Sequence, residues 1–159
     1  MGSTEGAWWT RRERNGHCIC PYNLLTHDLS VAKTFQQFLS HQNLAARKAF
    51  DEEARVWNRL GEHPNIARAH GVVESVGIPF MLAEYVPGGD LAEIIRSGSI
   101  TDDVTAVLKK AIDLCTGMRF AVEHGLSVHC DIKPANCLID GNGTLKVTDF
   151  GLRSPCAGV

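Results

Sequence analysis

The chain has 159 residues, of which 44% are hydrophobic and 21% charged, and its formal net charge is -2. These values are ordinary for a globular protein and argue against a disordered or fibrous chain. So small a charge favours neither nucleic acid nor an anionic membrane, and no apolar run approaches the roughly 20 residues that span a bilayer. We therefore expect a soluble protein with no nucleic-acid or membrane partner.

Six cysteines are spread along the chain. Only Cys18 and Cys20 are close together, and no second pair completes a zinc set. Cys115 stands at helical spacing among apolar residues and Cys137 in an apolar run, so buried free thiols are the simpler interpretation. The N-terminus also lacks the order of a secretory signal, and the two observations predict a cytoplasmic location.

The first segment of the chain, residues 1–28, shows no sustained period. We expect it to be irregular, or unrelated to the domain formed by residues 29–159. The run 29–35 is short, apolar and β-branched, which predicts a strand. Apolar residues at mostly three- and four-residue steps over 44–60 predict an amphipathic helix, which Gly61 ends.

The second half of the chain alternates between short strands and helices. Strands are predicted at 66–75 and 78–86, helices at 90–98 and 101–125, and a hairpin at 137–150. Thr101 is the expected N-cap of the long helix, and an Asp-Gly-Asn-Gly turn joins the two hairpin strands. The order has no βαβ alternation, which predicts an α+β protein with helices segregated from the sheet.

Polar residues of one chemical kind gather around the predicted hairpin. Asp131 and Asn136 lie in the loop before it, and Asp149 lies on its returning strand. Carboxylate and amide oxygens suit Mg²⁺, which usually keeps substrate phosphate and water as further ligands. Lys133 adds a positive charge that is useful against phosphate, and Asp131 is available to accept a proton. Together these residues favour phosphoryl transfer.

Four motifs then occur in a familiar order. The stretches "HCDIKPAN" and "VTDFG" resemble the catalytic loop and metal-binding motif of eukaryotic-type protein kinases, and the lysine in the first is typical of the serine/threonine branch. Upstream, "EARVWNRLGEHPNI" resembles the third helix of the family with its following loop, and "FMLAEYVPGGDL" resembles its hinge. The resemblance covers about residues 29–153.

This resemblance implies roles for the loop and hairpin residues. Asp131 would be the catalytic base, Lys133 would stabilise the transferring phosphoryl group, and Asn136 and Asp149 would hold Mg²⁺. The implied fold is a partial small β lobe with one helix, followed by the helical lobe as far as the metal-binding hairpin.

The ATP site is implied in the same way. Lys33 would hold the phosphates, paired with Glu53, whose immediate rival is Glu52. The Glu84 carbonyl and the Val86 amide would bind adenine. Further contacts are implied at three positions: Asp90 near the ribose, Leu138 as the floor of the pocket, and the small Ala83 at its back. Simpler readings are a solvated strand lysine at Lys33, a surface charge at Glu53 and a helix cap at Asp90.

Three further residues have an implied place in the core. Trp57, His129 and Phe150 would stack in an internal hydrophobic column. His129 is therefore expected to be structural, not catalytic.

The sequence also departs from the family pattern. One glycine, Gly16, stands where the family has G-x-G-x-x-G, and Cys130 replaces the arginine that senses a phosphorylated activation segment. No A-P-E motif follows, so we expect a truncated kinase domain whose long helix lacks cover and promotes self-association. The alternative is a pseudokinase-like remnant that binds nucleotide or a partner without transfer.

Overall fold

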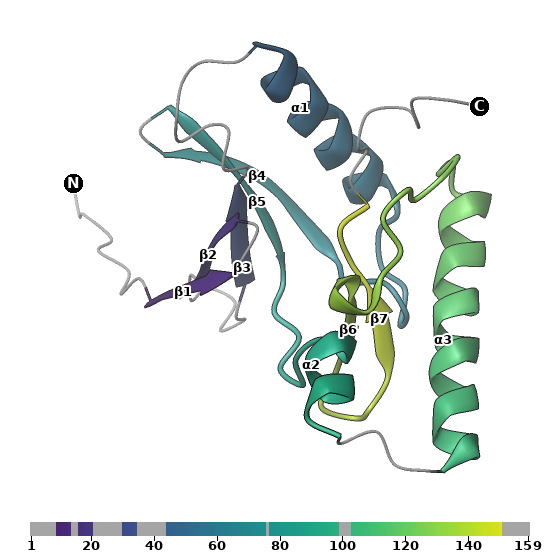
Figure 1. Ribbon diagram of the computed structural model, residues 1–159. Helices are drawn as coiled ribbons and strands as arrows, with labels where there is room; N and C mark the ends of the chain where they lie inside the picture. The colour runs from purple at the N-terminus through teal and green to yellow at the C-terminus, as the bar shows by residue number, and fades with distance from the viewer. Residues whose placement is uncertain are drawn as a thin grey trace.

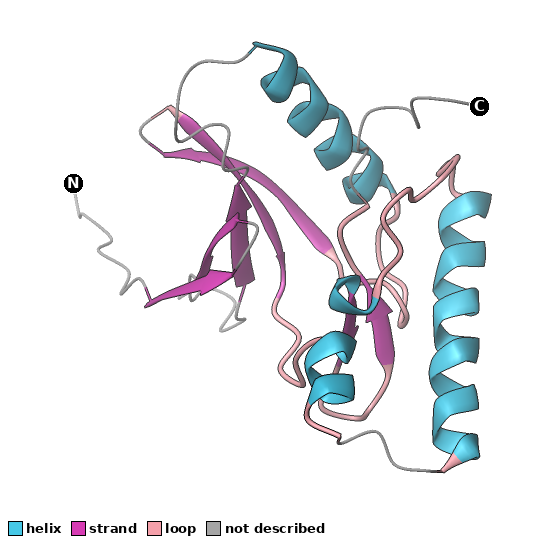
Figure 2. Cartoon of the chain, in the orientation of Figure 1, coloured by secondary structure: helices cyan, strands magenta, loops and turns pink. Residues whose placement is uncertain are grey.

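The computed structural model describes residues 9–13, 16–20, 30–34, 44–75, 77–98 and 103–150. In chain order these form β1 (Trp9–Glu13), β2 (Gly16–Cys20), β3 (Ser30–Thr34), α1 (Leu44–Arg59), β4 (Ala69–Ser75), β5 (Ile78–Glu84), α2 (Leu91–Arg96), α3 (Val104–Glu123), the 3-10 helix η2 (Pro134–Asn136), β6 (Cys137–Ile139) and β7 (Leu145–Val147). Figure 1 and Figure 2 show a sheet with α1 beside it, and a second region in which α2 and α3 flank the β6–β7 hairpin. This arrangement confirms the α+β class.

The main sheet is antiparallel and its five strands follow the order β1-β2-β3-β5-β4. Strands β1 and β2 lie within residues 1–28, and the prediction that this segment is irregular was wrong for these two stretches. They form by backbone pairing: β1 pairs with β2, and β2 pairs with β3, where Ile19 lies opposite Ala32. Such pairing does not require an alternating sequence. The domain boundary at residue 29 stays a prediction.

Helix α1 occupies the range that its periodicity predicted. Its apolar stripe is buried, with Phe50, Trp57 and Leu60 each 2% exposed. Gly61 follows the helix with a φ of 63°, a left-handed conformation that glycine adopts without steric cost. The predicted end of the helix is therefore confirmed.

The strand predicted at 66–75 begins later, at Ala69. Before it, the backbone pairs with β7 instead: Ala67 N–H donates to the Val147 carbonyl, and Val147 N–H donates to the Asn65 carbonyl, both at 2.9 Å. Ile66 and Ala67 are fully buried in this loop. The loop between α1 and β4 thus joins the sheet to the β6–β7 hairpin.

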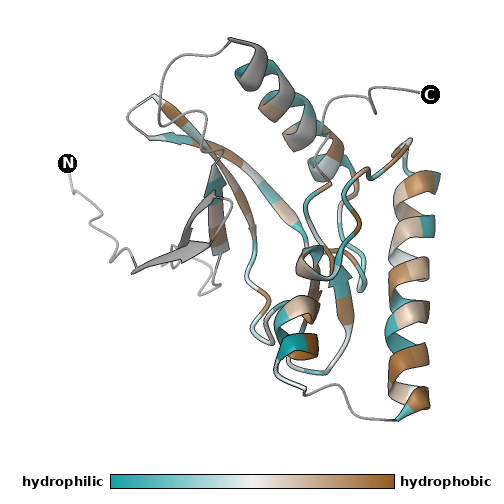
Figure 3. Ribbon diagram, in the orientation of Figure 1, coloured by the Kyte–Doolittle hydropathy of each residue, from teal (hydrophilic) through white to brown (hydrophobic). Residues whose placement is uncertain are grey.

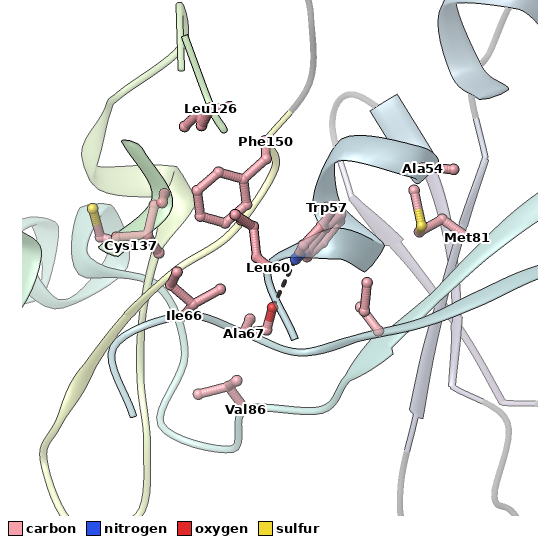
Figure 4. Close-up of a cluster of buried hydrophobic side chains, with 14 of the residues drawn as sticks. Ala54, Trp57, Leu60, Ile66, Ala67, Met81, Val86, Leu126, Cys137 and Phe150 are labelled. Atoms are coloured by element: carbon pink, nitrogen blue, oxygen red, sulfur yellow. Dashed lines mark hydrogen bonds between the residues drawn. The ribbon is translucent and has the colours of Figure 1, made fainter. Parts of the chain in front are cut away.

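One cluster of buried side chains connects these regions (Figure 4). It contains residues from α1, the loop before β4, β5 and the β6–β7 hairpin. Trp57 Nε1 donates to the Ala67 carbonyl at 2.7 Å, which satisfies the one polar group of its ring. Phe150 is fully buried in the same cluster, so the core fixes the residue that follows Asp149.

Helix α3 begins at an aspartate and not at Thr101. The Asp103 side chain accepts from the Thr105 N–H at 2.9 Å, so Asp103 is the N-cap and the Thr101 prediction was wrong. A carboxylate at this position also interacts favourably with the positive end of the helix dipole, which a threonine hydroxyl does not.

Most side chains of α3 are not buried. Only Gly117 and Ala121 of this helix are buried. Five of its large apolar side chains are 48–69% exposed, namely Val104, Val107, Leu108, Ile112 and Val122. Leu114, Met118 and Phe120 are partly buried against the core. Figure 3 shows brown, hydrophobic bands along the length of α3. The expected lack of cover is confirmed.

No helix within the described ranges is long and apolar enough to cross a membrane.

Candidate active site

The loop from Asp131 to Asn136 closes on itself through side chains. Lys133 Nζ lies 2.7 Å from Asp131 Oδ2. Asn136 Nδ2 donates to the same Oδ2 at 3.0 Å and to the Asp131 carbonyl at 2.9 Å. The 3-10 helix η2 makes this return possible, because Pro134 at its start turns the chain back within three residues. The structure therefore brings the three predicted loop residues together.

The loop is tied to the end of the hairpin. Thr148 N–H donates to the Asn136 carbonyl at 3.0 Å, and His129 Nε2 lies 3.2 Å from the Thr148 carbonyl oxygen. His129 is 2% exposed and its ring centroid lies 4.9 Å from that of Phe150. The ring centroids of Trp57 and Phe150 lie 6.1 Å apart. The three predicted aromatic residues therefore lie together, but their rings are tilted by 53° and do not stack. His129 is held as a packing residue.

Asp149 stands at the meeting point of the two regions. Lys33 Nζ of β3 pairs with Asp149 Oδ2, a contact that joins residues 116 apart in the chain. Asp149 has a φ of 61°, a left-handed backbone conformation that residues with a Cβ rarely adopt. The predicted phosphate-binding lysine and the predicted metal ligand are thus in direct contact.

The structure does not test the pair predicted between Lys33 and Glu53. The backbone of Glu53 belongs to α1, but its side chain lies outside the described residues. The Lys33–Glu53 pair therefore stays a prediction.

The hinge follows β5 and packs on β6 through backbone contacts. Gly88 N–H donates to the Ile139 carbonyl at 2.8 Å, and Ile139 N–H donates to the Gly89 carbonyl at 2.9 Å. A Cβ at Gly88 would lie 2.3 Å from the Ile139 oxygen, so this close approach requires glycine. The contact holds the hinge against the strand that carries Leu138.

The other predicted ATP residues lie around this hinge. Val86 is 6% exposed and Ala83 is 7% exposed. Asp90 caps α2, because its Oδ1 accepts from the Glu93 N–H at 2.8 Å, and it forms a β-bridge with Leu138. The capping role of Asp90 is confirmed. Its ribose contact, and the adenine contacts of the hinge, stay predictions.

Two residues of this region had no role assigned from the sequence. Asn65 Nδ2 donates to the Leu145 carbonyl at 3.0 Å, so it anchors the loop before β4 to β7. Lys146 pairs with Glu84 at 2.9 Å. Asn65 stands in the "HPN" motif and could have been singled out there. A single lysine in a short strand carries no comparable signal.

Local electrostatics stabilise the hairpin turn. Burial alone would raise the pKa of Asp140, but hydrogen bonds from the backbone N–H groups of Thr144 and Asn142 outweigh it and lower that pKa. Burial raises the pKa of the Cys137 thiol. The turn carboxylate therefore stays ionised as an acceptor, and the thiol stays protonated.

Comparison with known proteins agrees with this geometry. Residues 25–157 match the family model described as "Protein tyrosine and serine/threonine kinase". The chain belongs to this family. The matched range includes strands β3 to β5, the loop from Asp131 to Asn136 and the β6–β7 hairpin.

Three relatives illustrate the match. The chain is 42% identical over 102 residues to CBL-interacting serine/threonine-protein kinase 16 of Arabidopsis thaliana, which covers 60% of this chain and 20% of the relative. It is 40% identical over 96 residues to CBL-interacting protein kinase 5 of Oryza sativa subsp. japonica, covering 60% and 20%. It is 32% identical over 126 residues to serine/threonine-protein kinase 12 of Arabidopsis thaliana, covering 78% and 27%. The chain thus spans about a fifth to a quarter of these relatives.

Proposed function

We propose that this chain carries the catalytic centre of an ATP-dependent serine/threonine protein kinase. Such an enzyme transfers the γ-phosphoryl group of ATP to a hydroxyl of a protein substrate. The observation that carries the proposal is the contact between Lys33 and Asp149, which joins the implied phosphate lysine to the implied metal ligand. Membership of the kinase family supports it.

The loop residues divide the reaction between them. Asp131 accepts the proton of the substrate hydroxyl as that oxygen bonds to the γ-phosphorus and the bond to the β–γ bridging oxygen breaks, releasing ADP. Lys133, whose Nζ lies 2.7 Å from Asp131 Oδ2, donates to the phosphoryl oxygens. Asn136 holds Asp131 in place through two hydrogen bonds.

The residues present fit a magnesium ion. The resemblance to the family implies the Asp149 carboxylate and the Asn136 amide oxygen as ligands, and the described residues hold no group of three or more His, Cys, Asp or Glu side chains that could bind a metal. This sparse oxygen set suits Mg²⁺, which usually takes one or two carboxylates and completes its shell with phosphate and water. When bound, Mg²⁺ neutralises charge on the phosphates. The Asn136 Nδ2 is committed to Asp131, which leaves the amide oxygen as the ligand atom.

The finer assignments follow from the motifs and the relatives. The Lys133-Pro134 pair after Asp131 and the printed names of the relatives support a serine or threonine hydroxyl as acceptor. We also propose a cytoplasmic location and a protein substrate, with no nucleic-acid or membrane partner, in line with the small net charge of -2.

A second function is favoured by one observation. The β1–β2 hairpin, which precedes the strand lysine as it does in the family, has Gly16 as its only glycine. The backbone cradle for ATP phosphates that the family builds from several glycines cannot be read from it. A pseudokinase-like protein that binds nucleotide or a partner without transfer would have this property.

One assay separates the two functions. The purified chain is incubated with Mg²⁺, γ-labelled ATP and a generic protein substrate, beside the variants Asp149→Ala and Asp131→Asn. We expect transfer to serine and threonine by the wild type, and a loss of about 100-fold or more in each variant. Phosphoamino-acid analysis identifies the acceptor.

The matched control is Asp103→Asn. It exchanges a carboxylate for an amide at the N-cap of α3, where asparagine caps equally well, so transfer should not change. Thermal stabilisation by ATP without transfer would support the pseudokinase, and neither binding nor transfer would refute both functions.

A further inference from the structure

The least exposed lysine among the ion pairs of the described residues is Lys146. Its side chain is 14% exposed, against 34% for Lys33 and 36% for Lys133. Lys146 Nζ contacts both oxygens of Glu84, at 2.9 Å to Oε1 and 3.1 Å to Oε2. A pair that is partly removed from water and held through both oxygens interacts more strongly than an exposed surface pair.

Glu84 connects this pair to the sheet. Its Oε2 also accepts from the Arg68 N–H at 3.1 Å, while its own N–H donates to the Arg68 carbonyl at 2.8 Å. The residue is the last of β5, and its carbonyl is the proposed adenine contact. The carboxylate therefore fixes the orientation of the peptide on which the hinge begins.

Lys146 connects the pair to the metal-binding end. It lies three residues before Asp149 on β7, and the next residue, Val147, is held at both its N–H and its carbonyl by the loop before β4. Because these hydrogen bonds restrain the backbone at Val147, a displacement of Lys146 would be transmitted along the chain toward Asp149. Lys146 and Glu84 are 62 residues apart, so the pair is a second link between the regions, separate from Lys33–Asp149.

The pair also borders open space. Glu84 and Lys146 line a groove of about 920 Å³, together with His63, Arg68 and Tyr85. Water can reach the partner that remains after one charge is removed, so a variant here leaves no sealed, unpaired charge. This position suits a role in alignment better than one in core stability.

We infer that Glu84 and Lys146 form a positioning pair that aligns the adenine-binding hinge with the metal-binding motif and thereby raises nucleotide affinity. The inference rests on the proposed function, because the affinity in question is that for ATP. Neither side chain takes part in phosphoryl transfer, and each acts through the backbone that it orients.

The test measures binding of a non-hydrolysable ATP analogue with Mg²⁺ to the full chain by calorimetry. Lys146→Met keeps the methylene stem, and Glu84→Gln keeps an acceptor for the Arg68 N–H. Each should weaken binding by about 5-fold or more, and the double variant should be no weaker than the poorer single variant, because both remove one interaction. Lys146→Arg keeps the positive charge and should bind the analogue about as tightly as the wild type.

The matched control is Arg47→Met, which removes two ion pairs far from the hinge, those to Asp51 and Glu74. It should leave affinity unchanged. Circular dichroism at the binding temperature shows that each variant is folded, and Lys146→Arg and Glu84→Gln provide the test if Lys146→Met does not fold.

Three results would refute the inference. If both single variants bind the analogue as tightly as the wild type, the pair has only a structural role. If they bind it more tightly, the pair restrains the hinge and lowers affinity. In both cases the proposed function stands. A wild-type chain that binds no analogue would remove the proposed function itself, and the inference with it.

Discussion

Cys130 and Asp149 hold the left-handed backbone conformation, with φ values of 60° and 61°. Residues with a Cβ adopt it at a cost of order 1–3 kcal/mol, and it persists where neighbouring contacts determine the backbone. Here two contacts hold the backbone of Thr148. His129 Nε2 contacts its carbonyl oxygen, and its N–H donates to the Asn136 carbonyl. The strained positions are therefore Asp149 itself and Cys130, which directly precedes Asp131. Cys130 adopts this conformation at the position where the family pattern has arginine.

The cysteines give a prediction at the same scale. Cys137 is 3% exposed, as expected, and burial raises its pKa. Cys115 and Cys130 are exposed, so the burial expected for Cys115 was wrong. Because the thiolate is the reactive form, iodoacetamide at pH 8 should label Cys137 more slowly than the other two. Peptide mass spectrometry over a time course measures the three rates.

The control for this labelling is the unfolded chain, in which denaturant should make the three rates similar. Equal rates in the native chain would contradict the burial of Cys137.

At the scale of elements, α3 and the loop before β4 meet at a glycine. A Cβ at Gly117 would lie 2.5 Å from the backbone oxygen of Asn65. Asn65 in turn bonds to β7, and the Asp113 carboxylate of α3 accepts from the Leu145 N–H at 3.0 Å. The missing side chain thus lets the helix approach the loop and the hairpin together.

Gly117→Ala tests this contact. On a solvent-exposed helix face this substitution would raise the free energy of unfolding by up to about 1 kcal/mol, because alanine has a higher helix propensity than glycine. Here the clash with the Asn65 backbone should dominate and destabilise the fold by about 1–3 kcal/mol. Thermal unfolding followed by circular dichroism measures the effect.

Gly141→Ala is the matched control, because a Cβ there meets no atom within 4 Å. It should leave the unfolding temperature nearly unchanged. If Gly117→Ala were as stable as the wild type, the close packing of α3 on the loop would be wrong.

At the scale of the whole molecule, α3 carries five of the eleven exposed large apolar side chains among the described residues. Val104, Leu108 and Ile112 are 57–69% exposed along one stretch of the helix. Contiguous apolar surface of this kind favours association with other molecules. We propose that the isolated chain self-associates through this face.

The double variant Leu108→Lys/Ile112→Lys should shift the chain toward monomer, because two charges cannot be buried cheaply between helices. Sedimentation velocity over a range of concentrations measures the distribution of species. The control, Asn58→Lys/Asn142→Lys, adds the same charge at exposed positions outside α3 and should not change it. A wild type that is monomeric at every concentration would exclude self-association.

Local patterns in the sequence predicted much of the fold. The spacing of apolar residues predicted α1 and α3, and the glycine-rich turn predicted the β6–β7 hairpin, because helices and tight turns depend on neighbours in the chain. The motif spacing also predicted that Asp131, Lys133 and Asn136 lie together, and the structure confirms it.

What the sequence determined by itself is therefore the chemistry: which carboxylates, amide and lysines could serve phosphoryl transfer. Only the tertiary structure decided which of them meet across distance. Lys33 contacts Asp149 and Lys146 contacts Glu84. Strand β1 pairs with β2, and β2 with β3, although the sequence of β1 and β2 shows no alternation. Such contacts depend on how distant segments pack into one core, and no period along the chain records that.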